Sequence, residues 1–247
     1  MIPDRVLSKR KAAVIKALSL VKGKGRLGVG SGSTMDILLQ ELSEATRAEG
    51  RQVNVVPSSS QVELECSKLG LGISSLYESP RLEVVIDSAD EADADGNLLK
   101  GGGAALTREK VLYSSADKVV IVIEEEKKVL KLGSNHPLPV EVLPFSMPYV
   151  VEEIRRSLSV EPKVRLLPGK AGPLVTDNGN YVLDVPLGRI EDLSVTEAQL
   201  KAIPGVIETG IFFAKDGFLV VGTDQGVTVL EIRADSDRKA GGRIGGR

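Results

Sequence analysis

Short apolar runs alternate with longer polar stretches through the first half of the chain. Four such runs are rich in β-branched residues and Leu, and lie at residues 26–30, 53–57, 82–87 and 118–123. After the first of them, Met35, Leu38, Leu39 and Leu42 recur at helical spacing. Strands that alternate with helices predict a Rossmann-like parallel sheet with helices on both faces. Ligands of such sheets bind beyond the carboxyl ends of the strands, so the loops at 31–34, at 87–90 and after 123 should share one edge.

The pattern changes near Leu132. Four prolines fall between residues 137 and 148, which is typical of a crossing between domains. The elements predicted beyond this point are strands at 140–143, 164–167 and 181–185 and a helix at 149–158. Ser194 and Glu197 form a capping box that predicts the start of a second helix, and Pro204 is expected to end it. This order of elements predicts a smaller α+β domain of ferredoxin-like type.

We therefore expect an α/β protein with two domains. The Rossmann-like domain comprises residues 1–131 and 208–230, because strands at 206–213 and 218–221 should return to the first sheet. Residues 132–207 form the smaller domain. The tail, residues 231–247, is charged and then Gly/Arg-rich, so we expect it to be disordered.

Composition restricts the class of protein. Hydrophobic residues make up 42% of the 247 residues, and a formal net charge of −2 offers no broad basic surface for nucleic acid. The beginning of the chain lacks the apolar stretch of a signal peptide, and no run approaches the roughly 18 apolar residues of a membrane span. The single cysteine, Cys66, excludes an internal disulfide and a cysteine-based zinc site. These features predict a cytoplasmic protein with a local site for any anionic ligand.

A glycine-rich segment, GVGSGST at residues 28–34, follows the first apolar run and opens a helix. Glycines let the backbone approach an oxyanion, and free N–H groups at a helix N-terminus point toward it. The lysine of a Walker A loop is absent, and Ser33 stands where the dinucleotide fingerprint needs Gly or Ala. The segment is therefore either a site for a small phosphate group or a tight turn capped by Ser33 or Thr34.

Two further segments carry candidate chemistry. The first has four carboxylates between Asp87 and Asp93; it does not have the spacing of a calcium loop, and is either a solvated turn or a site that handles sugar hydroxyls. In the second, three glycines separate Lys100 from a helix that should carry Glu109. A carboxylate that takes a C–H proton beside an ammonium that stabilises the resulting oxyanion is suited to enolisation. Alone, each segment also fits an exposed loop.

The ordered strings resemble ribose-5-phosphate isomerase of the A type over roughly residues 6–230. They are GVGSGST (28–34), DSADE (87–91), KGGGAALTREK (100–110), PLPVEV (137–142), VTDNGN (175–180) and IPGV (203–206). The resemblance implies interconversion of ribose 5-phosphate and ribulose 5-phosphate through a cis-enediolate, without a metal or other cofactor. It implies a homo-oligomer, a dimer or a tetramer, that acts on a small sugar phosphate.

The resemblance also assigns roles to residues. Glu109 would be the base that moves the proton between C1 and C2, and Lys100 would stabilise the enediolate. Asp87 and Asp90 would serve ring opening and proton exchange between oxygens. The residues expected to contact substrate besides these are Arg10, Ser31, Gly32, Ser33, Thr34, Ser88, Ala89, Gly101, Gly102, Gly103 and Lys127. Near the N-terminus, Lys9, Arg10 and Lys11 all fit the family's phosphate-binding lysine, and ungapped counting favours Arg10.

The chain departs from the family pattern at three places. Ser88 replaces a glycine, which would cost about 1 kcal/mol if that position needs a positive φ. Three glutamates, 124–126, precede Lys127, and His136 occupies a usually aromatic position, where packing or surface exposure is expected rather than catalysis.

Two other functions compete with the isomerase. A sugar-phosphate sensor would need neither the acidic pair nor the Lys–Glu pair. An acyl-CoA transferase-like enzyme would use a glutamate nucleophile, but a helix after a Gly loop is a less natural place for it.

Overall fold

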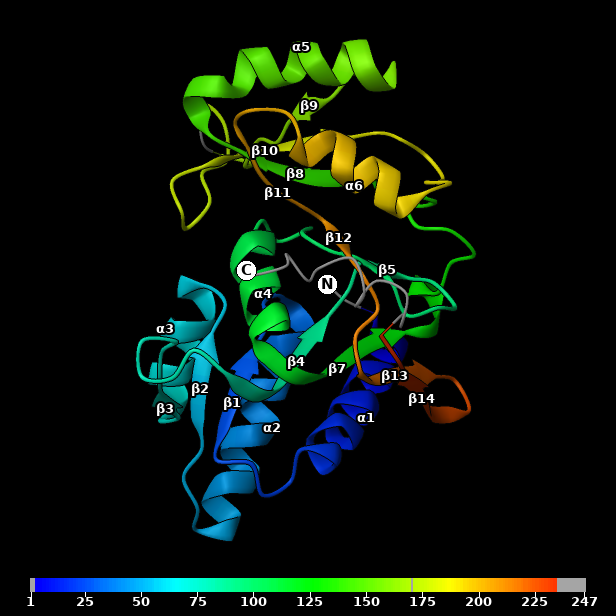
Figure 1. The fold of residues 1–247 in the computed structure, drawn as a ribbon. Coiled ribbons are helices and arrows are strands. Elements are labelled where there is room, and N and C mark those ends of the chain that lie inside the picture. The colour runs from blue at the N-terminus through cyan, green and yellow to red at the C-terminus, as the bar shows by residue number, and fades with distance from the viewer. Residues whose placement is uncertain (1–2, 170, 235–247) are drawn as a thin grey trace, which may run out of the picture.

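A seven-stranded sheet forms the body of the larger part of the molecule (Figure 1). The structure, a computed structural model, describes residues 3–169 and 171–234. The strands, in spatial order, are β14 (Gly226–Ile232), β13 (Gly217–Thr223), β7 (Ala116–Glu124), β4 (Leu82–Ser88), β1 (Arg26–Val29), β2 (Asn54–Pro57) and β3 (Gly72–Ile73). Every neighbouring pair is parallel except β13 with β14. The four apolar runs are β1, β2, β4 and β7, which confirms the predicted Rossmann-like sheet.

Helices cover both faces of this sheet. One face carries α1 (Asp4–Leu20), α2 (Ser33–Glu49) and α3 (Ser60–Leu69), and the other carries α4 (Leu106–Ser115). Because side chains alternate along a strand, Val84 and Ile86 of β4 pack toward α1 and α2, while Val85 packs with Leu112 of α4. None of the helices that the structure describes is both long enough and apolar enough to cross a membrane.

The second sheet has four antiparallel strands in the order β11-β8-β10-β9. Its elements, in chain order, are β8 (Leu138–Val142), the turn η2 (Pro144–Ser146), α5 (Met147–Leu158), β9 (Lys163–Val164), β10 (Tyr181–Val185), α6 (Leu193–Lys201) and β11 (Val206–Thr209). Val150 and Ile154 of α5 and Leu200 of α6 pack on this sheet. The βαββαβ order confirms the predicted ferredoxin-like α+β unit, which lies above the larger sheet in Figure 1.

A short three-stranded sheet connects the two units. It contains β5 (Glu91–Ala92), β6 (Leu98–Leu99) and β12 (Ile211–Phe212), all antiparallel. The prediction that a strand at 206–213 returns to the first sheet was wrong: β11 pairs within the second sheet, β12 pairs within the short sheet, and Gly210 separates the two strands. There, a Cβ would lie 2.3 Å from the carbonyl oxygen of Lys100.

Several predicted boundaries differ in the structure. The capping box prediction was wrong: Asp192 caps α6, accepting from the N–H groups of Ser194 and Val195 at 2.9 and 3.0 Å. The strand predicted at 164–167 is reduced to β9, followed by an isolated bridge at Leu166. Residues 208–209 pair within the second sheet, and residues 231–232 belong to β14. The N–H of Ala234 also donates to Asp216 at 2.8 Å, so the prediction of disorder was wrong for residues 231–234. The rest of that tail, from residue 235 on, lies outside the described residues.

Candidate active site

The carboxyl ends of three adjacent strands, β1, β4 and β7, open into one cavity. After these strands the chain continues as the 30–32 loop, as the 88–90 turn and as η1 (Glu125–Lys127). The residues that line the cavity are Ser31, Gly32, Ser33, Thr34, Ser88, Ala89, Asp90, Lys100, Gly101, Gly102, Gly103, Glu109 and Lys127. The predicted meeting of these loops at one edge of the sheet is confirmed.

A buried cluster of three charges lies at the inner end of the cavity. The Nζ of Lys100 lies 3.0 Å from Oδ2 of Asp87 and 3.1 Å from Oε2 of Glu109, and it donates to the carbonyl of Ser88 at 2.6 Å. These three side chains are 3%, 1% and 5% exposed. Asp87 does not line the cavity and reaches it through Lys100.

The short sheet brings Lys100 back to Asp87. Strands β5 and β6 form a hairpin after β4, with Glu91 opposite Leu99, so the chain reverses within a dozen residues. The N–H of Lys100 then donates to the carbonyl of Gly210 at 2.9 Å, which fixes its backbone. The ring centroid of Phe212 lies 5.4 Å from Nζ, a distance that allows a cation–π contact.

The glycine loop between β6 and α4 is held by a hydrogen bond to Asp90 and has an unusual backbone conformation. The N–H of Gly102 donates to Oδ2 of Asp90 at 2.8 Å. Gly101 has a φ of 105°, and Ala104 adopts a φ of 61°, a conformation rarely taken by residues with a Cβ. The loop delivers Glu109 in the first turn of α4, where Oε1 accepts from the N–H of Ser31 at 3.2 Å. Glu109 therefore links the Lys100 cluster to the glycine-rich loop.

The three candidate cations at the N-terminus take different partners. Nη1 of Arg10 donates to Oγ of Ser33 at 2.8 Å, whereas Lys11 pairs with Glu41 at 2.7 Å. Lys9 is buried and bonds Glu125 and Glu126. Of the three, Arg10 is the one that contacts the loop predicted to bind phosphate.

Burial perturbs the ionisation of the charge cluster. Desolvation, together with the facing Glu109 carboxylate, raises the pKa of Asp87 to about 7 against the opposing effect of Lys100. Burial lowers the pKa of Lys100, but the carboxylates of Asp87, Glu109 and Asp90 outweigh it and raise that pKa above its usual value. The ammonium thus stays charged, and the cluster can take up a proton near neutral pH.

Comparison with known proteins gives the family. The family model of ribose 5-phosphate isomerase A, also described as phosphoriboisomerase A, matches residues 54–226. Ribose-5-phosphate isomerase A of Methanothermobacter thermautotrophicus is 39% identical over 221 residues, which cover 90% of this chain and 96% of that protein. The chain belongs to the ribose 5-phosphate isomerase A family.

Solved structures of the family have the same fold. The ribose 5-phosphate isomerase A of Methanocaldococcus jannaschii superposes with a TM-score of 0.86 at 34% identity, over 91% of this chain and 99% of that one. A D-ribose-5-phosphate isomerase in complex with phospho-erythronic acid superposes with a TM-score of 0.87 at 35% identity, over 92% and 99%.

The departures from the family pattern have little effect on the geometry. Ser88 lies within β4, and the non-glycine residues with positive φ in the described chain are Ala104 and Ser159. The backbone strain considered for Ser88 is therefore absent. His136 is exposed, and its backbone N–H donates to Oε1 of Glu91 at 2.8 Å. Within the described ranges, no group of three or more His, Cys, Asp or Glu side chains is placed to hold a metal ion.

Several residues that shape the cavity were missed by the sequence analysis. Arg165 donates from Nη1 to the carbonyl of Gly101 at 2.7 Å and pairs with Asp184. Ser58 and Ser59 contact the hydroxyl of Ser31 at 2.6 and 2.9 Å. Each contact joins segments far apart in the sequence, so no local signal could have revealed it.

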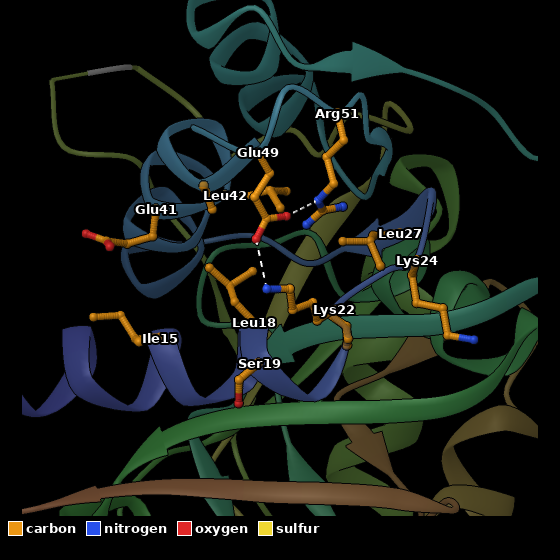
Figure 2. Close-up of a pocket in the computed structure, with 12 residues that line it drawn as sticks. Ile15, Leu18, Ser19, Lys22, Lys24, Leu27, Glu41, Leu42, Glu49 and Arg51 are labelled. Carbon is orange, nitrogen blue, oxygen red and sulfur yellow. Dashed lines mark hydrogen bonds and ion pairs between the residues drawn. The ribbon is translucent and has the colours of Figure 1, made fainter. Parts of the chain in front are cut away.

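A second hollow lies between α1 and α2, near the residues that precede β1 (Figure 2). It contains none of the residues expected to contact substrate. Three of its charged groups pair with one another, since Glu49 bonds both Lys22 and Arg51. The other two, Lys24 and Glu41, pair with residues outside the hollow. This hollow therefore does not offer a second site of the kind found at the ends of β1, β4 and β7.

Proposed function

We propose that the chain interconverts D-ribose 5-phosphate and D-ribulose 5-phosphate through a cis-enediolate, as part of the non-oxidative pentose phosphate pathway. In the aldose-to-ketose direction, the Glu109 carboxylate removes the proton from C2, and the electron pair moves into the C1–C2 bond. Negative charge then develops on the oxygen of C1. Glu109 returns its proton to C1, and the hydroxyl proton passes from the oxygen of C2 to that of C1.

The observation that carries this proposal is the placement of Lys100 between two carboxylates. Its ammonium lies 3.1 Å from Glu109 and 3.0 Å from Asp87, so base and oxyanion stabiliser share one small site. A positioned base contributes about 10²–10⁴-fold, and removing an oxyanion contact costs about 10²–10³-fold. Enolisation needs the base and the oxyanion stabiliser to act on the same two substrate carbons, C1 and C2.

The carboxylates beside Lys100 suit the proton transfers between oxygens. Because burial raises its pKa, Asp87 holds a proton near neutral pH. It can therefore exchange a proton with a sugar oxygen, and the proton is relayed through the cavity. Asp90 lines the cavity and also fixes the N–H of Gly102. We assign ring opening and oxygen-to-oxygen proton exchange to this pair.

The opposite end of the cavity suits a phosphate. Ser33 and Thr34 open α2, where free N–H groups and the helix dipole favour an anion. Lys127 lines the same end, and Arg10 contacts Ser33. An anchored phosphate places C1 and C2 of the open-chain sugar at Glu109, which reduces the entropic part of the barrier.

A coupled assay with ribose 5-phosphate tests the proposal. We expect formation of ribulose 5-phosphate, with and without EDTA, and far slower turnover of ribose, which lacks the phosphate anchor. A protein that binds the sugar phosphate without turning it over would be a sensor, and transfer of an acyl group from acyl-CoA would indicate the transferase. Either result would rule out the isomerase.

We also propose that the enzyme acts in the cytoplasm as a homo-oligomer without nucleic acid. The net charge of −2 supports the absence of a nucleic-acid partner. Leu143, Phe145 and Tyr149 are close in the chain and are 43%, 92% and 49% exposed, which fits a surface that another subunit covers. Light scattering after gel filtration measures the subunit number, and a monomer at working concentration would contradict the proposal.

A further inference from the structure

Glu124, the last residue of β7, lies between the two cations at the phosphate end of the cavity. Its Oε1 accepts from Nε of Arg10, and its Oε2 lies 3.3 Å from Nζ of Lys127. The side chain is only 4% exposed, against 14% for Arg10 and 24% for Lys127. One buried carboxylate therefore holds two side chains that reach the surface of the cavity.

The charge on Glu124 is maintained by these partners. Burial alone would raise its pKa, but the Lys127 ammonium and the Arg10 guanidinium hold that pKa below its usual range. Oε2 accepts no hydrogen bond from the described residues, so its stabilisation depends on the Lys127 charge. A buried acid that stays ionised can fix the geometry of both cations over the whole neutral range.

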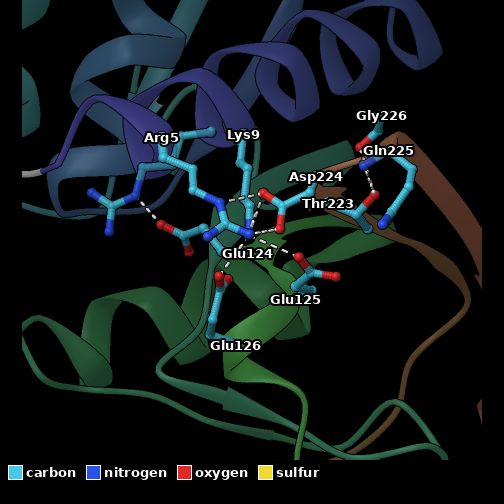
Figure 3. A network of polar contacts seen from close by, with 10 residues as sticks. Arg5, Lys9, Glu124, Glu125, Glu126, Thr223, Asp224, Gln225 and Gly226 are labelled. Atoms are coloured by element: carbon cyan, nitrogen blue, oxygen red, sulfur yellow. Dashed lines mark hydrogen bonds and ion pairs between the residues drawn. The ribbon is translucent and has the colours of Figure 1, made fainter.

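The neighbouring residues anchor the same arrangement. Lys9, next to Arg10 on α1, bonds Glu125 at 2.7 Å and Glu126 at 2.6 Å, and lies 3.1 Å from Asp224 (Figure 3). The side chain of Lys9 is only 3% exposed. Lys9 and Arg10 of α1 thus hold residues 124–126, where β7 passes into η1, the turn that carries Lys127.

We propose that Glu124 is a positioning residue for the substrate phosphate, holding Arg10 and Lys127 so that their remaining donors face Ser33 and Thr34. This inference rests on the proposed function, because it assigns the phosphate to that end of the cavity. Arg10 donates from Nε to Glu124 and from Nη1 to Oγ of Ser33, the latter at 2.8 Å. A planar guanidinium presents its donors in a fixed fork, so fixing one edge sets the direction of the other.

A carboxylate near a phosphate would also repel it, and the two effects predict opposite results. If Glu124 positions the cations, its removal weakens phosphate binding. If repulsion dominates, removal of the negative charge strengthens binding. Positioning is favoured because Glu124 is buried and bonded to both cations, so that its charge is already compensated before the phosphate arrives.

Glu124→Gln keeps the shape of the side chain and removes its charge. We expect the KM for ribose 5-phosphate and the calorimetric Kd for inorganic phosphate each to rise about tenfold, the loss of one charge-assisted contact, with kcat within about twofold. Glu124→Asp, which restores the charge on a shorter side chain, should recover part of the affinity. In an Arg10→Ala background, Glu124→Gln should cost less, because one of its two targets is gone.

Glu126→Gln is the matched control. Glu126 lies in the same acidic run and bonds Lys9, but it touches neither Arg10 nor Lys127 among its described contacts. Lys9 keeps its contacts with Glu125 and Asp224 in this variant, so η1 stays anchored and phosphate affinity should be unchanged. Tighter or equal phosphate binding by Glu124→Gln, or equal losses in Glu126→Gln, would overturn the positioning role. Calorimetry with inorganic phosphate needs no turnover, so an inactive wild type would refute the proposed reaction without deciding the role of Glu124.

Discussion

The backbone of Gly30 packs directly against the carboxylate of Asp87. A Cβ on Gly30 would lie 1.7 Å from Oδ1 and 1.9 Å from Cγ of Asp87, so no side chain fits there without displacing the acid. Gly30 also donates its N–H to the carbonyl of Ile86 at 2.9 Å, which continues the pairing of β1 with β4. The glycine that begins the phosphate loop therefore makes room for the buried charge cluster.

Gly30→Ala should displace Asp87 and break its contact with Lys100. We expect a loss of about 1–3 kcal/mol in the free energy of unfolding, the usual cost of overpacking, and a large loss of kcat. Urea denaturation and steady-state kinetics measure the two effects. Gly25→Ala is the control, because a Cβ on Gly25 would meet no atom within 4 Å. Normal activity in Gly30→Ala would contradict the need for this close packing.

Glu109→Gln should remove the base while keeping its size. We expect kcat to fall by about 10²–10⁴-fold, with little change in KM, because the phosphate end of the cavity is untouched. Glu63→Gln on α3, which alters an exposed carboxylate, should behave as wild type. Turnover close to normal in Glu109→Gln would remove this residue from the mechanism.

Lys100→Met should affect stability as well as activity. It leaves Asp87 and Glu109 buried without a cation, and breaking a buried ion pair costs about 3–5 kcal/mol. The loss should be larger at pH 8 than at pH 5, because at pH 5 the Asp87 carboxyl, whose pKa is raised by burial, is protonated and needs no cation. Unfolding by urea at both values measures this, with the exposed Lys16→Met as control. A loss independent of pH would show that the cluster is not held by charge.

Stability should fall as the pH rises through neutrality because of Asp87. Its pKa is raised to about 7 in the folded chain from 3.8, so the folded state binds the proton more tightly. The stabilisation is complete below about pH 4 and is lost as the pH rises through about 7. Asp87→Asn should remove this dependence, and the exposed Asp95→Asn should keep it. A similar slope in wild type and Asp87→Asn, measured by urea denaturation from pH 5 to 8, would place the titration elsewhere.

Local pattern was sufficient for most elements of the fold. The β-branched runs that became β1, β2, β4 and β7 are buried on both faces, and such strands read as continuous apolar segments. Two predictions failed where a contact between particular residues decided the outcome. Asp192 rather than Ser194 caps α6, and Gly210 interrupts a predicted strand at the point where its backbone pairs with that of Lys100.

The alternation of strands and helices predicted that the loops at 31–34, at 87–90 and after 123 would share one edge of the sheet, and the family resemblance added Lys100 and Glu109 to this site. Only the tertiary structure decided which atoms meet. The hairpin β5–β6 turns Lys100 back onto Asp87, and the order of strands places Glu124 beside Arg10, although 114 residues separate them. Such contacts depend on strand order and on helix packing across the sheet, which no short stretch of sequence encodes. For the same reason, only the tertiary structure shows that position 30 needs a glycine, because the Asp87 carboxylate lies directly against it.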